Sequence, residues 1–276
     1  MKILKFGGKS LANGEGLQKV IQTIAQKYFN NEPIAVVVSA RGNATDELLI
    51  LLKKAQVKIE FKSDFEQFKK YQLEGLKENI FEEEFSILHK LFEGVSLLGD
   101  YSEKIKDQVI AFGEILSAKY IAHVLNENSI KAQFTDTRQL IKTDDNFGNA
   151  QPIEEISKQN VIAYFLENQD KVNILTGFIG SNLNNETTTL GRNGSNYTAS
   201  LVANYLDAEE FQNYTHVDGI FTANPDLVAD AKKIERLSFN EANELANFGT
   251  QILHAKTIIP LVEKNIPLRT LNTFNA

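Results

Sequence analysis

Residues 187–200 read TTTLGRNGSNYTAS, and this stretch predicts a strand that runs through a tight loop into a helix. Its leading threonines favour extended backbone, because β-branched side chains fit a pleated sheet. Gly191 and Gly194 allow a sharp turn and a close approach of the backbone to a ligand. Ser195 and Asn196 are typical of the first residues of a helix. Such a strand, loop and helix is an ordinary unit of an α/β fold.

The helix that begins here also predicts an anion site. Its first turn presents unpaired N–H groups and a partial positive charge, which suit a phosphate or a carboxylate. Arg192 adds a planar guanidinium for the same kind of group. The alternative is a plain connection between strand and helix with a solvated arginine. A second glycine-rich loop at the start of the chain favours the anion site.

The composition is that of an ordinary globular protein. The chain has 276 residues, 42% of them hydrophobic and 24% charged, which suits one large α/β domain or two lobes that share a sheet. A formal net charge of -7 argues against binding to nucleic acid or to a membrane surface. The absence of cysteine excludes disulfides and thiolate catalysis. No stretch resembles a signal peptide or a membrane span, so we expect a cytoplasmic protein.

The start of the chain contains the second loop. Residues 2–6 are predicted as a strand, and GGKS at 7–10 as the turn into a helix over about 14–29. The letters GKS are not a P-loop, because Ile3 stands where that motif has its first glycine. Lys5 lies just before the two glycines, whose N–H groups suit phosphate oxygens. A solvated lysine at a sheet edge is the more common alternative.

A polar loop follows the next predicted strand. Residues 34–38 are a continuous apolar run, as in a buried parallel strand, and residues 39–46 read SARGNATD. Open α/β sheets bind ligands at the carboxyl ends of their strands, so this loop is a candidate binding segment. Thr45 or Asp46 is expected to cap a helix that begins near Glu47.

The middle of the chain is predicted to be helical. Residues 53–98 contain phenylalanine and leucine at helical spacing, which predicts packed helices with an aromatic core rather than a cofactor site. A long helix is expected over about 102–126. Glu114 stands there among apolar residues, where a carboxylate either pairs with a cation or points into a cleft. A surface position is the alternative, and both interpretations stay open.

The rest of the chain alternates strands and helices. Further strands are predicted at 131–135, 172–176, 211–217 and 266–271, and further helices at 153–168, 239–248 and 254–264. This alternation predicts a mainly parallel sheet with helices on both faces. The four histidines are scattered, which argues against a histidine metal site. No G-x-S-x-G elbow supports Ser-His-Asp catalysis.

Seven segments resemble, in order, the motifs of the aspartokinase family. They are KFGGKS at 5–10, VVVSA at 36–40, FGEILSA at 112–118, TGFIGSN at 176–182, TTTLGRNGSNYTA at 187–199, THVDGIFTANP at 215–225 and FGTQILHAKTIIP at 248–260. The resemblance implies the amino-acid-kinase (carbamate-kinase-like) fold, a three-layer α/β/α sandwich around a mainly parallel sheet. It also implies aspartate kinase activity, in which Mg-ATP phosphorylates the β-carboxylate of L-aspartate to 4-phospho-L-aspartate, the first step towards lysine, threonine and methionine.

The resemblance implies roles for individual residues. The expected catalytic residues are Lys5, Lys9 and Asn196, with Lys5 neutralising the transferring phosphoryl group. In the expected substrate site Arg192 binds the α-carboxylate of aspartate and Glu114 its ammonium, beside Ser39, Thr45, Asn193, Gly194 and Ser195. The expected nucleotide site contains Lys5, Gly7, Gly8, Ser10, Thr215, His216, Phe221, Asp226, Gln251 and Ile252. No protein ligand for a metal is expected, because phosphate oxygens would hold most of the Mg²⁺ shell.

Several positions depart from the family pattern. Lys9 replaces a threonine, and Asn196 replaces an aspartate. At the nucleotide site His216 replaces an aspartate, Asp226 an arginine and Gln251 a lysine. Two cations that would face ATP are missing, so we expect weaker or altered nucleotide binding. Lys9 restores one positive charge, and the amide of Asn196 keeps a hydrogen-bond acceptor without the negative charge.

We expect a single catalytic domain over 1–276, with a substrate lobe over about 1–180, a nucleotide lobe over about 181–276 and no ACT regulatory domain. The chain resembles the kinase part of bifunctional aspartokinase/homoserine dehydrogenases more than the lysine-sensitive single enzymes. Expected partners are L-aspartate, ATP and a second copy of the chain. In the full-length protein, fusion to regulatory and homoserine dehydrogenase domains is expected; nucleic acid and membranes are not expected partners.

Two alternatives remain open. The first is a kinase for another amino acid, such as glutamate or an N-acetylated amino acid, although Glu114 argues against an acetylated substrate that has no free ammonium. The second is a kinase-like domain of low activity that serves the assembly of a bifunctional chain. The altered nucleotide residues favour this second alternative, whereas Lys5, Glu114 and Arg192 oppose it.

Lys9 is expected to compensate for the lysine missing at Gln251. Lys9→Thr should therefore raise the apparent KM for ATP, because one positive charge near the phosphates is lost. Initial rates at varied ATP concentration measure this effect, and an unchanged KM would contradict the compensation.

Overall fold

A central sheet of six parallel strands organises the fold. The computed structural model describes residues 1–222, 228, 230–241 and 255–275. Within them the strand order is β10 (Leu268–Asn272), β7 (Glu210–Thr215), β1 (Lys2–Phe6), β2 (Ile34–Val38), β4 (Val172–Thr176) and β3 (Ala132–Thr135). Lys5 of β1 is in register with Val37 of β2 and Asn213 of β7, so the first strand lies inside the sheet. Parallel strands end at one edge, where ligands bind in such sheets.

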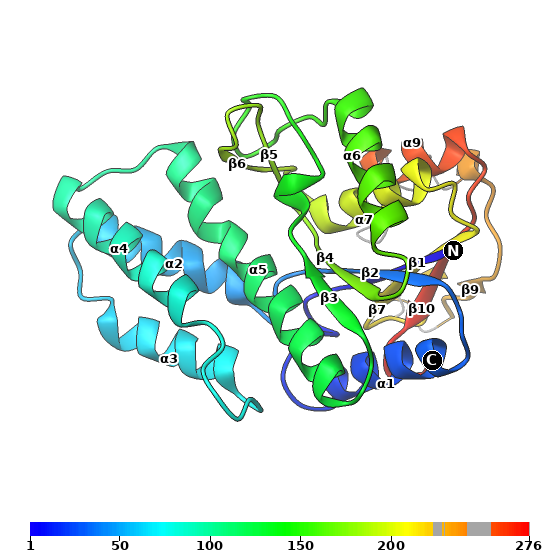
Figure 1. Cartoon of the computed structure of the whole chain (residues 1–276), viewed down its shortest axis with the longest axis horizontal. Helices are drawn as coiled ribbons and strands as arrows, with labels where there is room; N and C mark the ends of the chain where they lie inside the picture. Colours follow the sequence, from blue (N-terminus) through cyan, green and yellow to red (C-terminus); the bar gives the residue numbers. More distant parts are fainter. Residues whose placement is uncertain (223–227, 229, 242–254, 276) are drawn as a thin grey trace.

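Helices cover both faces of this sheet (Figure 1). Leu4 and Phe6 share one core with α1 (Glu15–Phe29) and α5 (Glu103–Glu127). Ile3 belongs to a second core with α6 (Glu154–Glu167), α7 (Gly194–Tyr205) and α9 (Ala255–Glu263). Alternate side chains of a strand point to opposite faces, which explains the two cores. The expected three-layer α/β/α sandwich is confirmed.

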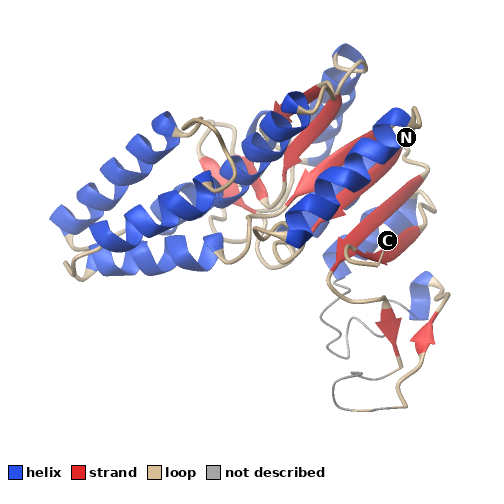
Figure 2. Cartoon of the chain, turned by 90° about the horizontal axis from the view of Figure 1, so that it is seen from below, coloured by secondary structure: helices blue, strands red, loops and turns tan. Residues whose placement is uncertain are grey.

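A helical excursion, which includes the helices predicted over 53–98, extends to one side of the sheet (Figure 2). It consists of α2 (Ala44–Gln56), α3 (Lys62–Leu73) and α4 (Glu82–Leu98); α2 and α4 pack against α5, and α3 packs against α2. The phenylalanines at helical spacing form its core, as predicted, and the buried ones are Phe61, Phe65, Phe68, Phe81, Phe85 and Phe92.

Two small antiparallel ribbons stand apart from the central sheet. The strand predicted in the opening stretch is β6 (Thr187–Thr189), and it pairs with β5 (Ile179–Ser181) rather than with the central sheet. Phe178, with φ 68°, turns the chain after β4, so that β5 leaves the direction of the parallel strands. The second ribbon pairs β8 (Ile220–Phe221) with β9 (Lys233–Ile234), and a short 3-10 helix, η1 (Thr137–Gln139), follows β3.

One predicted helix begins earlier than expected, and another lies partly outside the described residues. The helix expected near Glu47 begins at Ala44, because the chain turns at Gly42, with φ 57°, and enters the helix through Asn43. Thr45 and Asp46 therefore lie inside its first turn and do not cap it. Of the helix expected over 239–248, residues 239–241 are helical and the remainder lies outside the described residues.

The expected lobe boundary at about residue 180 stays a prediction. Strands from both segments share the central sheet, since β1 lies between β2 and β7. None of the described helices combines the length and the apolar character that a membrane crossing requires.

Gly177 lets α7 approach the sheet closely. A Cβ at this position would lie 2.5 Å from Cβ of Ser195 and 2.8 Å from the carbonyl oxygen of Val38. Gly177→Ala is therefore expected to lower the free energy of unfolding by about 1–3 kcal/mol, because the helix start must move away. Urea unfolding followed by circular dichroism measures the change.

Gly94 of α4 provides the matched control. A Cβ there meets nothing within 4 Å, so Gly94→Ala should stabilise the protein by about 0.5–1 kcal/mol. Equal unfolding midpoints for Gly177→Ala and the parent protein would contradict the close approach.

Candidate active site

A cavity of about 480 Å³ lies at the carboxyl end of the sheet, between α5 and the first turn of α7. The structure brings together there all of the residues predicted to bind the substrate. The predicted residues that line the cavity are Lys5, Gly8, Ser39, Thr45, Glu114, Arg192, Asn193, Gly194, Ser195 and Asn196. Their individual roles in binding and catalysis stay predictions.

Glycines let the loops of the cavity pack against each other. The N–H of Gly42 donates to the carbonyl of Gly8 at 3.0 Å, and the N–H of Gly7 donates to the carbonyl of Tyr214 at 3.2 Å. A Cβ on Gly8 would lie 2.8 Å from the carbonyl oxygen of Ala40. Any side chain at Gly8 would therefore separate the loops that follow β1 and β2.

Two ionisable side chains, one basic and one acidic, are buried in the cavity wall. Lys5 of β1 is 9% exposed and Glu114 of α5 is 3% exposed. Burial lowers the pKa of Lys5 to about 8, a shift that the charge of Glu114 opposes. Burial raises the pKa of Glu114 to about 8, against the effects of the Ala40 N–H and the charge of Lys5. Both groups titrate near neutral pH, so a charged ligand would decide their protonation.

Glu114 has one carboxylate oxygen available to a ligand. Its Oε1 accepts a hydrogen bond from the N–H of Ala40 at 3.2 Å, whereas its buried Oε2 has no partner among the described residues. Gly113 allows this approach, since a Cβ there would lie 2.8 Å from Cβ of Ala40. A buried acceptor without a donor is costly, which favours a ligand that brings an N–H group.

The loop between β6 and α7 presents Arg192. Gly191, with φ 77°, and Asn193, with φ 58°, adopt left-handed conformations on either side of it. Arg192 is exposed and makes no hydrogen bond or ion pair with the part of the chain that the structure describes. Oδ1 of Asn196, in the first turn of α7, is likewise buried without a partner there. Both groups are available to a ligand.

Two predicted nucleotide residues, Thr215 and His216, lie beside the predicted catalytic residue Lys9 beyond the ends of β1 and β7. Nζ of Lys9 is 3.4 Å from Nε2 of His216, and Oγ1 of Thr215 is 3.4 Å from Nδ1 of the same ring. Burial, together with the charge of Lys9, lowers the pKa of His216. The imidazole is therefore mostly neutral at pH 7, and the pair contributes one positive charge rather than two.

The other predicted nucleotide residues are more dispersed. Ser10 is fully buried outside the cavity, where its hydroxyl accepts a hydrogen bond from Oγ1 of Thr273 at 2.7 Å. Phe221 lies in β8 and is partly exposed. Asp226, Gln251 and Ile252 lie outside the described residues.

Protein ligands for a metal ion are scarce in the described ranges. They contain no group of three or more histidine, aspartate or glutamate side chains that could hold a metal. That phosphate oxygens would hold most of a Mg²⁺ shell stays a prediction.

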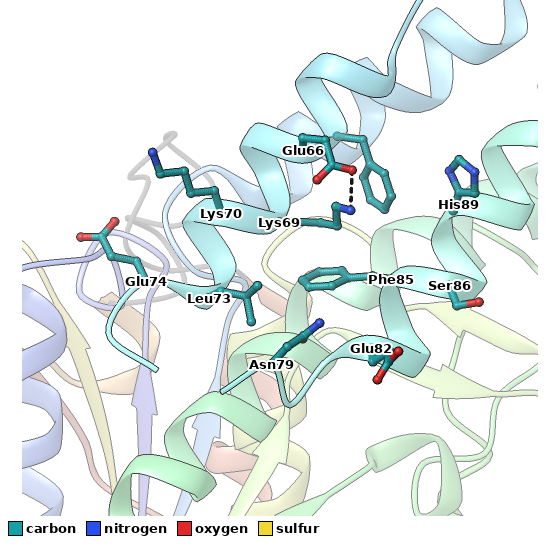
Figure 3. Close-up of a pocket in the computed structure, with 11 residues that line it drawn as sticks. Glu66, Lys69, Lys70, Leu73, Glu74, Asn79, Glu82, Phe85, Ser86 and His89 are labelled. Atoms are coloured by element: carbon teal, nitrogen blue, oxygen red, sulfur yellow. Dashed lines mark ion pairs between the residues drawn. The ribbon is translucent and has the colours of Figure 1, made fainter. Parts of the chain in front are cut away.

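A larger hollow of about 850 Å³ lies between α3 and α4, apart from the predicted site (Figure 3). Leu73 and Phe85 line it, and an ion pair joins Glu66 and Lys69 at its side. Most of its charged groups are exposed and of both signs. We place the candidate active site in the smaller cavity, because the buried ionisable groups Lys5 and Glu114 line it.

Sequence reasoning missed Asp107, which also lines the cavity. It is fully buried on α5, seven residues before Glu114. Seven residues are close to two helical turns, so both acids lie on one face of the helix. That spacing within an apolar helix is the signal that the sequence offered.

The match to a known family covers almost the entire chain. A sequence profile described as the amino acid kinase family matches residues 1–272. The chain belongs to this family. The central parallel sheet and its two helical layers agree with the fold that the resemblance implied.

Curated aspartokinases resemble this amino acid kinase over nearly its full length. Lysine-sensitive aspartokinase 3 of Escherichia coli (strain K12) is 31% identical over 96% of this chain, and the match covers 60% of that protein. The bifunctional aspartokinase/homoserine dehydrogenase of Buchnera aphidicola subsp. Acyrthosiphon pisum (strain APS) is 31% identical over 100% of this chain and 35% of that protein. The chain thus spans only part of these relatives, and both kinds match at the same identity.

A solved structure agrees with this comparison. The crystal structure of E. coli aspartokinase III in complex with aspartate and ADP (R-state) has a TM-score of 0.89 and 31% identity. The match covers 99% of this amino acid kinase and 62% of that chain. The resemblance to aspartokinases inferred from the sequence motifs is confirmed.

The raised pKa of Glu114 predicts a pH-dependent effect of Glu114→Gln. The folded protein holds a proton on Glu114 up to about pH 8, whereas the unfolded chain loses it near 4.5. The stability of the parent protein relative to Glu114→Gln should therefore fall as the pH rises from about 4.5 to about 8, by up to about 1.4 kcal/mol per pH unit. Urea unfolding of both proteins across this range measures it, and a constant difference would contradict the raised pKa.

Proposed function

We propose that this amino acid kinase transfers the γ-phosphoryl group of Mg-ATP to the β-carboxylate of L-aspartate. The observation that carries the proposal is the unpaired Oε2 of Glu114 in the same cavity as the unpaired guanidinium of Arg192. These two groups match the ammonium and the carboxylate that every free α-amino acid carries. The aspartokinase relatives and the solved structure with aspartate and ADP support aspartate as the amino acid.

Binding of the amino acid would settle the charge of Glu114. An ammonium beside Oε2 lowers the pKa of the carboxyl group, so Glu114 becomes an anion when the substrate is bound. Arg192 would bind the α-carboxylate, and Ser39, Thr45 and Ser195 would add hydroxyl groups. The β-carboxylate would then lie towards Lys5 and the start of α7.

The transfer itself needs positioning and positive charge. An oxygen of the β-carboxylate forms a bond to the γ-phosphorus while the bond from that phosphorus to the bridging oxygen breaks, and ADP leaves with the electron pair. The attacking carboxylate is already ionised, so this step needs no general base. Lys5 would face the phosphoryl oxygens, whose negative charge raises its pKa above about 8 and keeps it protonated.

The nucleotide would lie at the ends of β1 and β7. The N–H groups after β1 and the N-terminus of α7 suit phosphate oxygens, and Lys9 supplies a positive charge beside His216. Bound Mg²⁺ would shield phosphate charge. Asn196, with its unpaired Oδ1, would accept a hydrogen bond near the reacting groups. Binding by Asp226, Gln251 and Ile252 stays a prediction from the sequence.

An ADP-release assay with Mg-ATP tests the proposal. L-Aspartate should support turnover, whereas L-glutamate and N-acetylglutamate should support little. Lys5→Ala should lower kcat by at least about 100-fold, because phosphoryl charge is no longer neutralised. Arg192→Ala should raise the KM for aspartate about tenfold or more and leave the KM for ATP nearly unchanged.

The controls separate the alternatives. Circular dichroism shows that each variant is folded. Turnover with glutamate in place of aspartate would replace the proposed substrate. A folded protein that shows no turnover with any of the three would overturn the proposal and favour a kinase-like domain that serves assembly.

The finer features of the biological context stay predictions. Bifunctional relatives support a kinase domain that works beside regulatory and homoserine dehydrogenase domains. Self-association of the chain and its cytoplasmic location are likewise proposals that follow from the sequence motifs.

A further inference from the structure

Asp107 is a buried carboxylate that the proposed reaction does not use. It lies on α5 at the cavity and is shielded from solvent. Its Oδ2 accepts hydrogen bonds from the N–H of Gly148 at 2.8 Å and the N–H of Thr189 at 2.9 Å. Its Oδ1 accepts a hydrogen bond from the hydroxyl of Thr189 at 2.8 Å. Both oxygens are therefore engaged by the protein, unlike those of Glu114.

One helix thus holds two separate walls of the cavity. Glu114 binds the N–H of Ala40 in the loop after β2, and Asp107 binds Thr189 at the end of β6. Seven residues of α-helix place the two anchor points about 10 Å apart along the axis. Because α5 is one continuous helix and both acidic side chains are buried on it, the helix sets the spacing between the two walls.

The hydrogen bonds from Thr189 to Asp107 matter more for β6 than they would for a strand inside the central sheet. Among the described residues β6 pairs only with β5, through three residue pairs, and an isolated two-stranded ribbon is marginally stable. Thr189 also accepts a hydrogen bond from the N–H of Ala150 at 2.8 Å. A Cβ on Gly191 would lie 2.5 Å from Oδ1 of Asn149, so the segment that Asp107 holds through Gly148 also supports the turn before Arg192.

We propose that Asp107 is a positioning residue that fixes the Gly191–Arg192 turn relative to Glu114 and so sets the grip on the two ends of the amino-acid substrate. The part of this inference that concerns the substrate rests on the proposed function. Asp107 itself does not touch the substrate, because its two oxygens already accept three hydrogen bonds. It acts through Thr189 and Gly148.

Hydrogen exchange tests the anchor without any substrate. The N–H of Leu190 donates to Phe178 at 2.9 Å, and the N–H of Gly194 donates to Gly191 at 3.0 Å, so both amides flanking Arg192 are protected. Asp107→Asn replaces one acceptor oxygen by a donor. Exchange at Leu190 and Gly194 should become at least about tenfold faster, because a buried N–H loses its acceptor.

Kinetics test the consequence for the substrate. Asp107→Asn should raise the KM for aspartate by about tenfold, with kcat and the KM for ATP changed by less than about twofold. Thr189→Val keeps the carboxylate and both backbone bonds and removes only the hydroxyl bond. It should therefore show a smaller change in the same direction.

Glu84→Gln is the matched control for the loss of a buried acid. Glu84 of α4 is 6% exposed and pairs with Lys119 of α5, away from the cavity lining. It should lower the stability of the fold without raising the KM for aspartate.

Each outcome decides the proposal. If amide exchange at Leu190 and Gly194 is unchanged in Asp107→Asn, the proposal is overturned. It is also overturned if Asp107→Asn weakens kcat and ATP binding as much as it weakens aspartate binding. If the parent protein shows no turnover with aspartate, the proposed function fails, while the exchange measurement, which needs no substrate, still decides whether Asp107 holds the turn. If Asp107→Asn does not fold, Thr189→Val provides both measurements.

Discussion

The site depends on two ionisable groups, the amine of Lys5 and the carboxyl group of Glu114, that the fold buries without pairing them fully. Moving a lysine or a carboxylate out of water costs several kcal/mol, and their mutual attraction offsets this only when geometry and hydrogen bonds are complete. Here Lys5 makes no hydrogen bond with the described residues, and one oxygen of Glu114 is without a partner. Lys5 is complementary to an anion and Glu114 to an ammonium, so a ligand that carries both groups would provide the missing hydrogen-bond and charge partners.

Helix α5 positions the acidic side chains of the cavity. It carries Glu114 and Asp107 on one face, and the helical excursion holds it from the outside. Arg41 directly follows Ala40, the loop residue whose N–H donates to Glu114, and it is fully buried. Its guanidinium lies 3.7 Å from the ring centre of Tyr120 on α5. It also donates a hydrogen bond to the carbonyl of Gln72 on α3 at 2.9 Å. The excursion therefore contributes to the candidate active site by packing, and it also carries Thr45, whose hydroxyl the proposed substrate site uses, in the first turn of α2.

The side of the cavity where we propose that the nucleotide binds is organised differently. Its charge comes from Lys9 beside a histidine that burial keeps mostly neutral. The family pattern places an acid at His216 and a threonine at Lys9, so this chain exchanges a negative charge for a neutral ring and adds a cation at the neighbouring loop. The two departures lie in contact, and together they make this part of the site more positive than the family pattern implies.

Much of the fold could be read from local patterns. Apolar runs and helical spacing predicted the six strands of the sheet, the helices and the aromatic core of the excursion. They did so because the spacing of apolar residues along the sequence follows the period of the strand or helix that buries them. The motifs also predicted ten of the residues that line the cavity, although they missed Asp107. Ser10 shows the limit of this approach, since it follows the glycines in sequence but bonds Thr273 inside the core.

The sequence by itself thus determined the class of fold, the family and the chemical groups of the site. Only the tertiary structure decided that β6 leaves the central sheet, that Arg192 stands unpaired, and that Asp107 and Glu114 hold opposite walls of one cavity. The physical reason is that strand pairing, burial of a charge and the shift of its pKa depend on neighbours distant in the chain. Local propensity carries no information about those neighbours until the chain has packed.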